Sequence, residues 1–169
     1  TTVTDANYTN DANQAKIGDY LFSDGTWGAL ANNTGKTPIA VIFSNTTSTT
    51  DQGHGWTHGY AMALKNASTD AVWDMKNGTV VPNPTGVYLD FTNASMIADK
   101  DGYTNTNKIL NSISTPVIFS AAYAAATTYN STIAAPSNTS GWYLPSVGQW
   151  FDICVNLGKM SATGYYDQG

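Results

Sequence analysis

The stretch GWYLPSVGQWFDICVNLG at residues 141–158 carries the strongest structural pattern in the chain. Its apolar residues after the proline recur at i, i+3, i+4, i+7 and i+8, a spacing that places them on one face of a helix. These residues are Val147, Trp150, Phe151, Cys154 and Val155. The spacing predicts that this face is buried. Cys154, the only cysteine, is therefore expected to be a buried small hydrophobic residue and not a nucleophile.

The start of this helix is marked by a capping pattern. Ser146 is placed to cap the helix, and Gln149 three residues later can reach back to the Ser146 amide, which closes a capping box. Pro145 stops the helix from extending backwards, and Gly158 is a suitable C-terminal stop. The alternating side chains at 142–144 predict a short strand that turns directly into the helix.

The same stretch resembles the signature of C-type lectin-like domains at the ends of bacterial surface adhesins and fimbrial tip proteins. The residues that carry the resemblance are Trp142, Leu144, Pro145, Ser146, Gln149 and Trp150. The segments 17–27 and 37–44 are similar to the opening of the same surface domains. Sulfatase-modifying enzymes and the variable receptor-binding proteins of diversity-generating retroelements use the same broad fold. The resemblance implies an α+β, C-type lectin-like fold of short twisted strands with two or three packed helices.

This domain is expected to span residues 16–169, after a polar leader or linker at residues 1–15. In the family that the chain resembles, further strands follow the last helix, whereas residues 159–169 are mostly polar and small. The domain is therefore expected to lack its last strands and to leave an open strand edge near 142–144. A neighbouring chain or a downstream segment is expected to complete the sheet.

Several strands are predicted in the first half of the chain. Apolar alternation and short apolar runs predict a hairpin at 17–27, a strand buried on both faces at 39–43 and a strand at 60–64. The dipeptide Asn77-Gly78 predicts a further hairpin turn. Strands early in the chain and helices later favour the α+β class.

Two more helices are predicted in the second half. Asn105 or Thr106 is expected to cap the first of them. The second is expected to begin at Thr115, which is followed by Pro116 at the first helical position, and to run to about Tyr129.

The composition excludes several partner classes. Only 11% of the 169 residues are charged, the 7 basic residues are all lysines and the formal net charge is -5. Phosphate groups would be repelled and would meet no arginine, so nucleic-acid binding is disfavoured. No run is long and apolar enough to cross a bilayer, and membrane insertion is not expected. A polar surface of Thr, Ser and Asn favours an extracellular or cell-surface location.

Two segments contain residue types that bind metals. His54 and His58 would share a face of a helix, but the intervening glycines and the lack of a glutamate favour structural histidines. Residues 99–107 place side-chain oxygens at alternate positions, yet only two of them are carboxylates and the glycine is misplaced for an EF-hand. No cofactor is therefore expected, with calcium at 99–107 as the alternative.

Aromatic residues in glycine-rich or polar loops are the candidate ligand contacts, because such loops can present stacking surfaces. The candidates are Trp56, His54, Trp73 and Tyr103. No catalytic residue is assigned, because the sequence shows no evident set of nucleophile, base and carboxylate.

These features favour a non-catalytic extracellular binding module of the adhesin or fimbrial-tip type, with a glycan or protein ligand. The alternative is a phage or retroelement-diversified receptor-binding protein of the same fold. An enzyme of the sulfatase-modifying type is disfavoured, because that family uses paired reactive cysteines and this chain has one cysteine.

Overall fold

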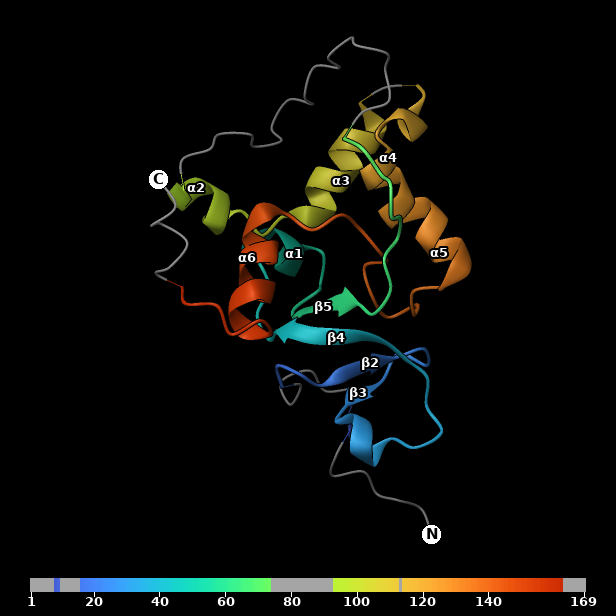
Figure 1. Ribbon diagram of the computed structural model, residues 1–169, viewed down its shortest axis with the longest axis vertical. Helices are drawn as coiled ribbons and strands as arrows, with labels where there is room; N and C mark the ends of the chain where they lie inside the picture. The colour runs from blue at the N-terminus through green and yellow to red at the C-terminus, as the bar shows by residue number, and fades with distance from the viewer. Residues whose placement is uncertain (1–7, 10–15, 74–92, 113, 163–169) are drawn as a thin grey trace. The chain divides into compact units, whose positions relative to one another are not determined.

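The computed structural model describes residues 8–9, 16–73, 93–112 and 114–162 (Figure 1). These residues form two compact units. In the described chain, unit 1 comprises residues 8–9, 16–65, 136–139 and 151–162, and unit 2 comprises residues 66–73, 93–112, 114–135 and 140–150. Helix α6 (Val147–Asn156) contributes residues to both units. The predicted turn at Asn77-Gly78 lies outside the described residues, and a single domain at 16–169 stays a prediction.

An antiparallel sheet forms the frame of unit 1 (Figure 1). Its strands are β1 (Tyr8–Thr9), β2 (Tyr20–Phe22), β3 (Trp27–Gly28), β4 (Pro38–Ser44) and β5 (Tyr60–Ala63). Their order across the sheet is β1-β3-β2-β4-β5. The predicted hairpin is confirmed, because β2 and β3 pair with Leu21 opposite Trp27.

Strand β4 lies between β2 and β5 and forms the centre of the sheet. Its residues Ile39, Ala40, Ile42 and Phe43 are buried. Since successive residues of a strand point to opposite faces, this burial confirms a strand covered on both sides. Strand β5 confirms the strand predicted at 60–64, although it ends one residue earlier.

The core of unit 1 joins this sheet to the second half of α6. The buried cluster consists of Phe43, Tyr60 and Ile153, with Met62 and Leu157 packed against it. The rings of Phe43 and Tyr60 stack with centroids 5.8 Å apart. The side-chain amide of Asn156 donates to the Phe43 carbonyl at 2.9 Å. Residues 151–156 of α6 are thereby held on strand β4.

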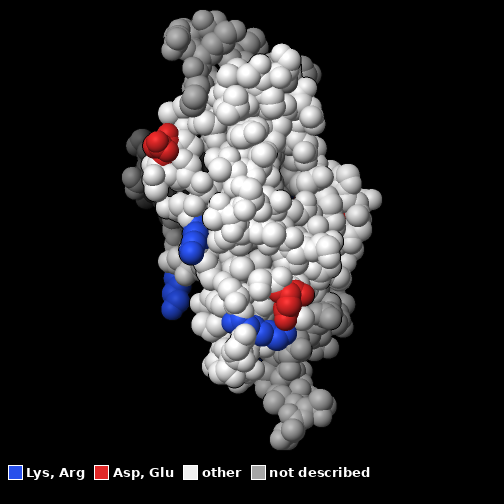
Figure 2. Space-filling model, turned by 90° about the vertical axis from the view of Figure 1, so that its right-hand side faces the viewer, with Lys and Arg blue, Asp and Glu red and all other residues white. Residues whose placement is uncertain are grey.

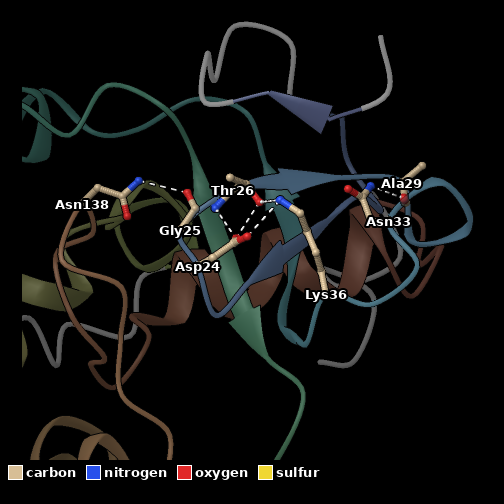
Figure 3. A network of polar contacts seen from close by, with 7 residues as sticks. All are labelled: Asp24, Gly25, Thr26, Ala29, Asn33, Lys36 and Asn138. Atoms are coloured by element: carbon tan, nitrogen blue, oxygen red, sulfur yellow. Dashed lines mark hydrogen bonds and ion pairs between the residues drawn. The ribbon is translucent and has the colours of Figure 1, made fainter. Parts of the chain in front are cut away.

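A polar network surrounds the turn that follows β2 (Figure 3). The Asp24 carboxylate accepts hydrogen bonds from the Thr26 N–H at 3.0 Å and the Thr26 hydroxyl at 2.6 Å, and it pairs with Lys36 at 2.9 Å. Burial acts to raise the pKa of Asp24, but the bonds from Thr26 and Lys36 outweigh it and lower the pKa to about 2. The Asn138 side chain donates to the Gly25 carbonyl at 3.0 Å, so the same turn also holds residues 136–139.

We expect the Asp24 network to lose its stabilising effect in acid. The pKa of about 2 in the folded protein lies below the ordinary value of 3.8, so the contribution is complete above about pH 4 and is lost as the pH falls towards about 2. Because the Asp24 side chain is half exposed, the effect is less than about 1 kcal/mol. Denaturant unfolding of the wild type and Asp24→Asn from about pH 6 to about pH 2 should show the two free energies converging. A difference that stayed constant over this range would contradict the expectation.

The described part of unit 2 is helical (Figure 1). Besides the first turn of α6, its elements are α2 (Asn93–Ala98), α3 (Gly102–Asn111), the 3₁₀ turn η3 (Pro116–Ile118), α4 (Ser120–Tyr123), the π-helical turn η4 (Ala124–Thr128) and α5 (Tyr129–Thr132). The buried cluster of this unit consists of Ile109, Phe119 and Ala122, with Leu110, Ile118 and Leu144 packed against it.

The helix predicted from Thr115 is interrupted. Phe119, with φ −84° and ψ 70°, separates η3 from α4, and the helical run then continues to Thr132. Two features hold the break in place. The Phe119 side chain is buried in the core, and the Ser120 hydroxyl accepts from the Val72 N–H at 2.9 Å and donates to the Val72 carbonyl at 3.0 Å.

Helix α3 begins at Gly102, earlier than the predicted cap at Asn105 or Thr106. Asp99 organises this start, because its carboxylate accepts from a backbone N–H two residues later at 2.8 Å and from the Asn105 amide at 2.9 Å. Thr106 is buried inside the helix instead of capping it. Its hydroxyl donates to the Leu144 carbonyl at 3.2 Å and accepts from the Leu144 N–H at 3.0 Å.

The capping box predicted at the start of α6 is confirmed. The Gln149 N–H donates to Ser146 Oγ at 3.2 Å, and the Ser146 N–H donates to Gln149 Oε1 at 3.1 Å. Ser146 Oγ also donates to the Asp99 carbonyl at 2.6 Å, and Gln149 Nε2 donates to the Tyr143 hydroxyl at 3.0 Å. The Gln149 side chain is 0% exposed. These four residues, here called the cap network, form a polar cluster in which Ser146 and Gln149 are buried and Asp99 and Tyr143 are half-buried.

The predicted burial of the apolar face of α6 is wrong. Val147, Trp150 and Cys154 are exposed, with Trp150 at 48%. The buried residues of the helix include Gln149 and Ile153, which are four residues apart and therefore share a face. The physical reason is the cap network, since its hydrogen bonds turn Gln149 inward and leave Trp150 on the outer side.

The strand predicted at 142–144 is also wrong. The backbone of Leu144 bonds to the Thr106 side chain and not to a neighbouring strand. The Trp142 indole N–H donates to the Ile133 carbonyl at 2.7 Å, and its ring packs edge-on against Tyr129. Because the segment has no ladder bonds in the described structure, the open strand edge expected there is absent. The broader α+β class is confirmed by the sheet of unit 1 and the helices of unit 2.

Candidate functional site

The segment GHGWTHG at residues 53–59, here called the aromatic loop, connects helix α1 (Thr49–Gly53) to strand β5 in unit 1. Helix α1 is a short helix of five residues. Ser48 accepts the Asp51 N–H at 3.1 Å, and the helix ends at Gly53. His54 and His58 therefore follow the helix and do not share a helical face.

Two glycines determine the path of the aromatic loop. Gly59 has φ +136°, and a Cβ at this position would collide with the Ser44 carbonyl oxygen and lie 3.0 Å from Asn45 Cα. Gly55 has φ +86°, a left-handed conformation that other residues adopt at a cost. Gly59 therefore allows the loop to lie directly against the end of β4, and Gly55 allows it to turn.

A buried hydrogen-bonded set, here called the anchor, lies at the base of the loop and consists of Ser48, Asp51 and Tyr60. The Tyr60 hydroxyl donates to Asp51 Oδ2 at 2.7 Å and accepts from the Ser48 N–H at 2.9 Å. Asp51 is 2% exposed. Burial raises the pKa of Tyr60 to about 12, and the Asp51 carboxylate acts in the same direction. The hydroxyl therefore remains protonated and able to donate at neutral pH.

The anchor holds the loop through backbone groups. The N–H groups of His54 and Trp56 donate to the Asp51 carbonyl at 3.0 and 3.1 Å. On the other side, the Thr47 hydroxyl donates to the Trp56 carbonyl at 2.8 Å. The Gln52 amide in turn donates to the Thr47 carbonyl at 3.0 Å. Backbone bonds on both sides of Trp56 in the chain thus fix the course of the loop.

Two aromatic pairs lie along the loop. The rings of His54 and Trp56 stack with centroids 4.8 Å apart and an interplanar angle of 27°. His54 is exposed and Trp56 is half-buried. His58 is exposed, its Nδ1 lies 3.1 Å from the Thr57 hydroxyl, and its ring lies 6.0 Å from that of the buried Trp27. The loop therefore presents imidazole and indole surface on a fixed backbone.

The other predicted contact residues, Trp73 and Tyr103, belong to unit 2. Trp73 is 39% exposed and packs edge-on against Phe119, with centroids 6.1 Å apart. Tyr103 is half-buried, lies on the first turn of α3 and not in a loop, and packs edge-on against Tyr143. Of the four predicted contacts, the structure thus pairs His54 with Trp56 and gives the other two separate neighbours.

The segment considered for calcium is mostly helical. Residues 102–107 belong to α3, and both carboxylate oxygens of Asp99 accept hydrogen bonds from protein N–H groups. Within the described ranges, no group of three or more His, Cys, Asp or Glu side chains is placed to hold a metal ion.

The sequence on either side of the aromatic loop is polar but almost uncharged. Between Ser44 and Tyr60 the only Asp, Glu, Lys or Arg is the buried Asp51. Gln52 and Thr57 are exposed and carry both hydrogen-bond donors and acceptors. Figure 2 shows that sparse charge is general on the face it presents, where most of the described surface is neither acidic nor basic.

Sequence patterns identified the loop but missed its anchor. Ser48 followed three residues later by Asp51 is a capping pattern, so the start of α1 could have been found in the sequence. The partner of Asp51 is nine residues away, on the other side of the loop. No local spacing rule links Asp51 to Tyr60, because the contact depends on the course of the loop between them.

No family model, curated protein or solved structure matches the chain. In the described residues, no helix is both long enough and apolar enough to span a membrane. Functional inference therefore depends on the geometry of the aromatic loop and on the motif at the start of α6.

Replacing Tyr60 by Phe is expected to lower the free energy of unfolding by about 2 kcal/mol. The variant removes the hydroxyl that Ser48 and Asp51 both bond to, and it leaves a buried carboxylate oxygen without that donor. Thermal and denaturant unfolding measure the change. Tyr20→Phe on strand β2 is the matched control, with an expected change within about 0.5 kcal/mol. Equal effects of the two substitutions would show that the hydrogen bonds of the anchor contribute little to the free energy of unfolding.

Proposed function

We propose that the chain is a non-catalytic binding module of the extracellular, surface-adhesin type, and that its ligand, a glycan or the surface of another protein, binds at the aromatic loop. The observation that carries this proposal is the stacked His54–Trp56 pair, held on a loop whose backbone is fixed by a buried anchor. A rigid loop that exposes aromatic rings loses little conformational entropy when it binds.

The motif at the start of α6 supports a C-type lectin-like fold, which is the finer part of the same proposal. Its capping box is formed, and Gly148 lies against the carbonyls of residues 97 and 99. These contacts account for glycine and glutamine at positions 148 and 149, after Ser146. Experimental coordinates that placed the strands in another topology would contradict the fold proposal.

The residue types of the site favour binding over catalysis. Asp51, the only carboxylate in the sequence between Ser44 and Tyr60, is buried and accepts the Tyr60 hydroxyl. Cys154, the only thiol of the chain, lies on α6 and has no second cysteine with which to form a reactive pair. The groups exposed on the loop are suited to stacking and hydrogen bonding.

The proposal is tested by probing an array of immobilised glycans and cell-surface proteins with the labelled protein, with calcium and with a chelator. Wild type is compared with the double variant His54→Ala/Trp56→Ala and with Trp150→Ala. The Trp150 variant is a matched control, because it also removes an exposed tryptophan but lies on α6. Circular dichroism melts establish that each variant is folded.

Loss of binding in the loop variant with retention in Trp150→Ala would support the site. Retention in the loop variant, with loss in Trp73→Ala or Tyr103→Ala, would move the site to unit 2. Binding that required calcium would contradict the expectation that no cofactor is needed.

A further inference from the structure

We propose that two copies of the chain pair through strand β5, so that the sheet of unit 1 continues from one copy into the other about a two-fold axis at Met62. The pairing does not depend on what the aromatic loop binds. Three observations carry it: the outward hydrogen-bonding groups of β5, the symmetry of their positions and an exposed leucine on the same face of the strand.

Strand β5 lies at one edge of the sheet, with β4 on its inner side (Figure 1). The Leu64 N–H, directly after the strand, donates to the Ile39 carbonyl of β4 at 3.1 Å. Residues of an antiparallel pair alternate between positions that bond to the neighbouring strand and positions that do not. Met62 therefore also bonds to β4, whereas Ala61 and Ala63 direct their N–H and C=O groups to the outer side.

The bonds of β4 agree with this pattern. Ile42, which is opposite Ala61, donates to the Asp19 carbonyl at 2.7 Å and accepts from the Gly18 N–H at 2.9 Å, so its backbone bonds away from β5. Within the described ranges, no backbone hydrogen bond joins Ala61 or Ala63 to another segment. Charged residues or prolines often prevent the pairing of such an edge, and residues 60–64 contain neither.

The outward groups are self-complementary about Met62. When a second copy runs antiparallel with the partner's Met62 opposite Met62, Ala61 lies opposite the partner's Ala63, and Ala63 lies opposite the partner's Ala61. Each of these two pairs exchanges two N–H···O=C bonds, so both donors and both acceptors on the outer side of each copy are satisfied. The alanine side chains are small and leave room for the second strand.

Any extended peptide could supply these backbone bonds, but Leu64 favours a second copy. Leu64 is 44% exposed and lies two residues after Met62, on the same face of the strand. Met62 packs against the buried cluster that contains Tyr60, yet it is only half-buried itself. In the two-fold register, Leu64 lies opposite the partner's Tyr60 and diagonal to the partner's Met62. Each copy thus covers the exposed leucine of the other with an apolar surface.

The interface is small, which sets the expected affinity. A strand of four or five residues buries less than the roughly 800 Å² per partner that is typical of stable complexes. We therefore expect a weak dimer with a Kd on the order of 100 µM.

Sedimentation equilibrium of the intact chain at up to about 1 mM measures the association. Ala63→Pro should raise the Kd at least about tenfold, because proline removes an outward N–H and spares the bonds between β5 and β4. Trp150→Ala removes an exposed apolar side chain from α6 and should leave the Kd unchanged. Circular dichroism melts establish that each variant is folded.

Oxidative cross-linking tests the register, in a Cys154→Ser background that leaves the introduced cysteine as the only thiol. The two thiols of Met62→Cys would face each other across the axis, with the Cα atoms roughly 4.5 Å apart, a distance that a disulfide can bridge. Leu64→Cys is the matched control on the same strand face, because its two thiols would lie about 14 Å apart along the sheet. Leu64 is the more exposed position, so random collisions would favour cross-linking there.

A dimer that Ala63→Pro weakens, with faster cross-linking of Met62→Cys than of Leu64→Cys, would support the proposal. A chain that stayed monomeric at about 1 mM would overturn it and leave the β5 edge to an extended segment of a different protein. A dimer that Trp150→Ala weakened and Ala63→Pro did not would also overturn it, because the contact would then lie on α6. Equal cross-linking of the two cysteine variants would overturn the two-fold register.

Discussion

Replacing Gln149 by Ala is expected to lower the free energy of unfolding by about 3–5 kcal/mol. Gln149 is fully buried, its Oε1 accepts the Ser146 N–H and its Nε2 donates to the Tyr143 hydroxyl. Alanine would leave both groups without these bonds and would also open a cavity. Denaturant unfolding monitored by circular dichroism measures the loss.

The matched control is Trp150→Ala, one position further along the same helix. Trp150 is a far larger side chain, but it is 48% exposed, so we expect its removal to cost less than about 1 kcal/mol. A larger loss from Trp150→Ala than from Gln149→Ala would show that the helix is turned with its apolar face inward, as the apolar spacing alone predicts.

Replacing Gly148 by Ala is expected to cost about 3 kcal/mol, the second largest effect among these variants. A Cβ at Gly148 would collide with the Asp99 carbonyl oxygen and approach the Ile97 carbonyl oxygen to 2.5 Å. Both obstacles are backbone atoms, so relief requires the connection between α2 and α3 to move. The steric cost exceeds the gain of about 1 kcal/mol that alanine brings to a helix interior.

Gly53→Ala is the control for this substitution. Gly53 also lies in a helix, and a Cβ there would meet nothing within 4 Å. Its expected effect is neutral to stabilising by about 0.5–1 kcal/mol, because the unfolded chain loses freedom. Similar melting temperatures for the Gly148 and Gly53 variants would contradict the close packing described at the start of α6.

The comparison of Gln149 with Trp150 also shows how far the sequence predicts the fold. The capping box could be predicted, because it depends on two residues three positions apart and on the local helix geometry. The buried face could not, because it depends on Tyr143 and on the Asp99 carbonyl, which is 47 residues from Ser146 in the chain. Apolar spacing assumes that only hydrophobic residues are buried, and here a polar side chain whose oxygen and nitrogen are both hydrogen-bonded is buried instead.

The candidate site was predictable to a similar extent. Glycines and aromatic residues at 53–59 indicated a displayed loop, and the stacked pair His54 and Trp56 lies there. The early strands were found because the alternation and the apolar runs of a sheet are local patterns. The break at Phe119 was not found, because the Ser120–Val72 bonds that hold it join residues 48 positions apart.

The anchor has a consequence for how this protein can vary. It reaches the loop through the carbonyl of Asp51, which accepts from the backbone N–H groups of His54 and Trp56, and every residue other than proline can supply these two donors. Ser48, Asp51 and Tyr60 thus support the course of the loop, whereas residues 54 and 56 would set the ligand preference if the loop binds a ligand as proposed. Related proteins could then differ at residues 54 and 56, and so differ in ligand, while they keep the same loop structure. Selection for diversity would then act on a few adjacent codons while the supporting codons stayed constant.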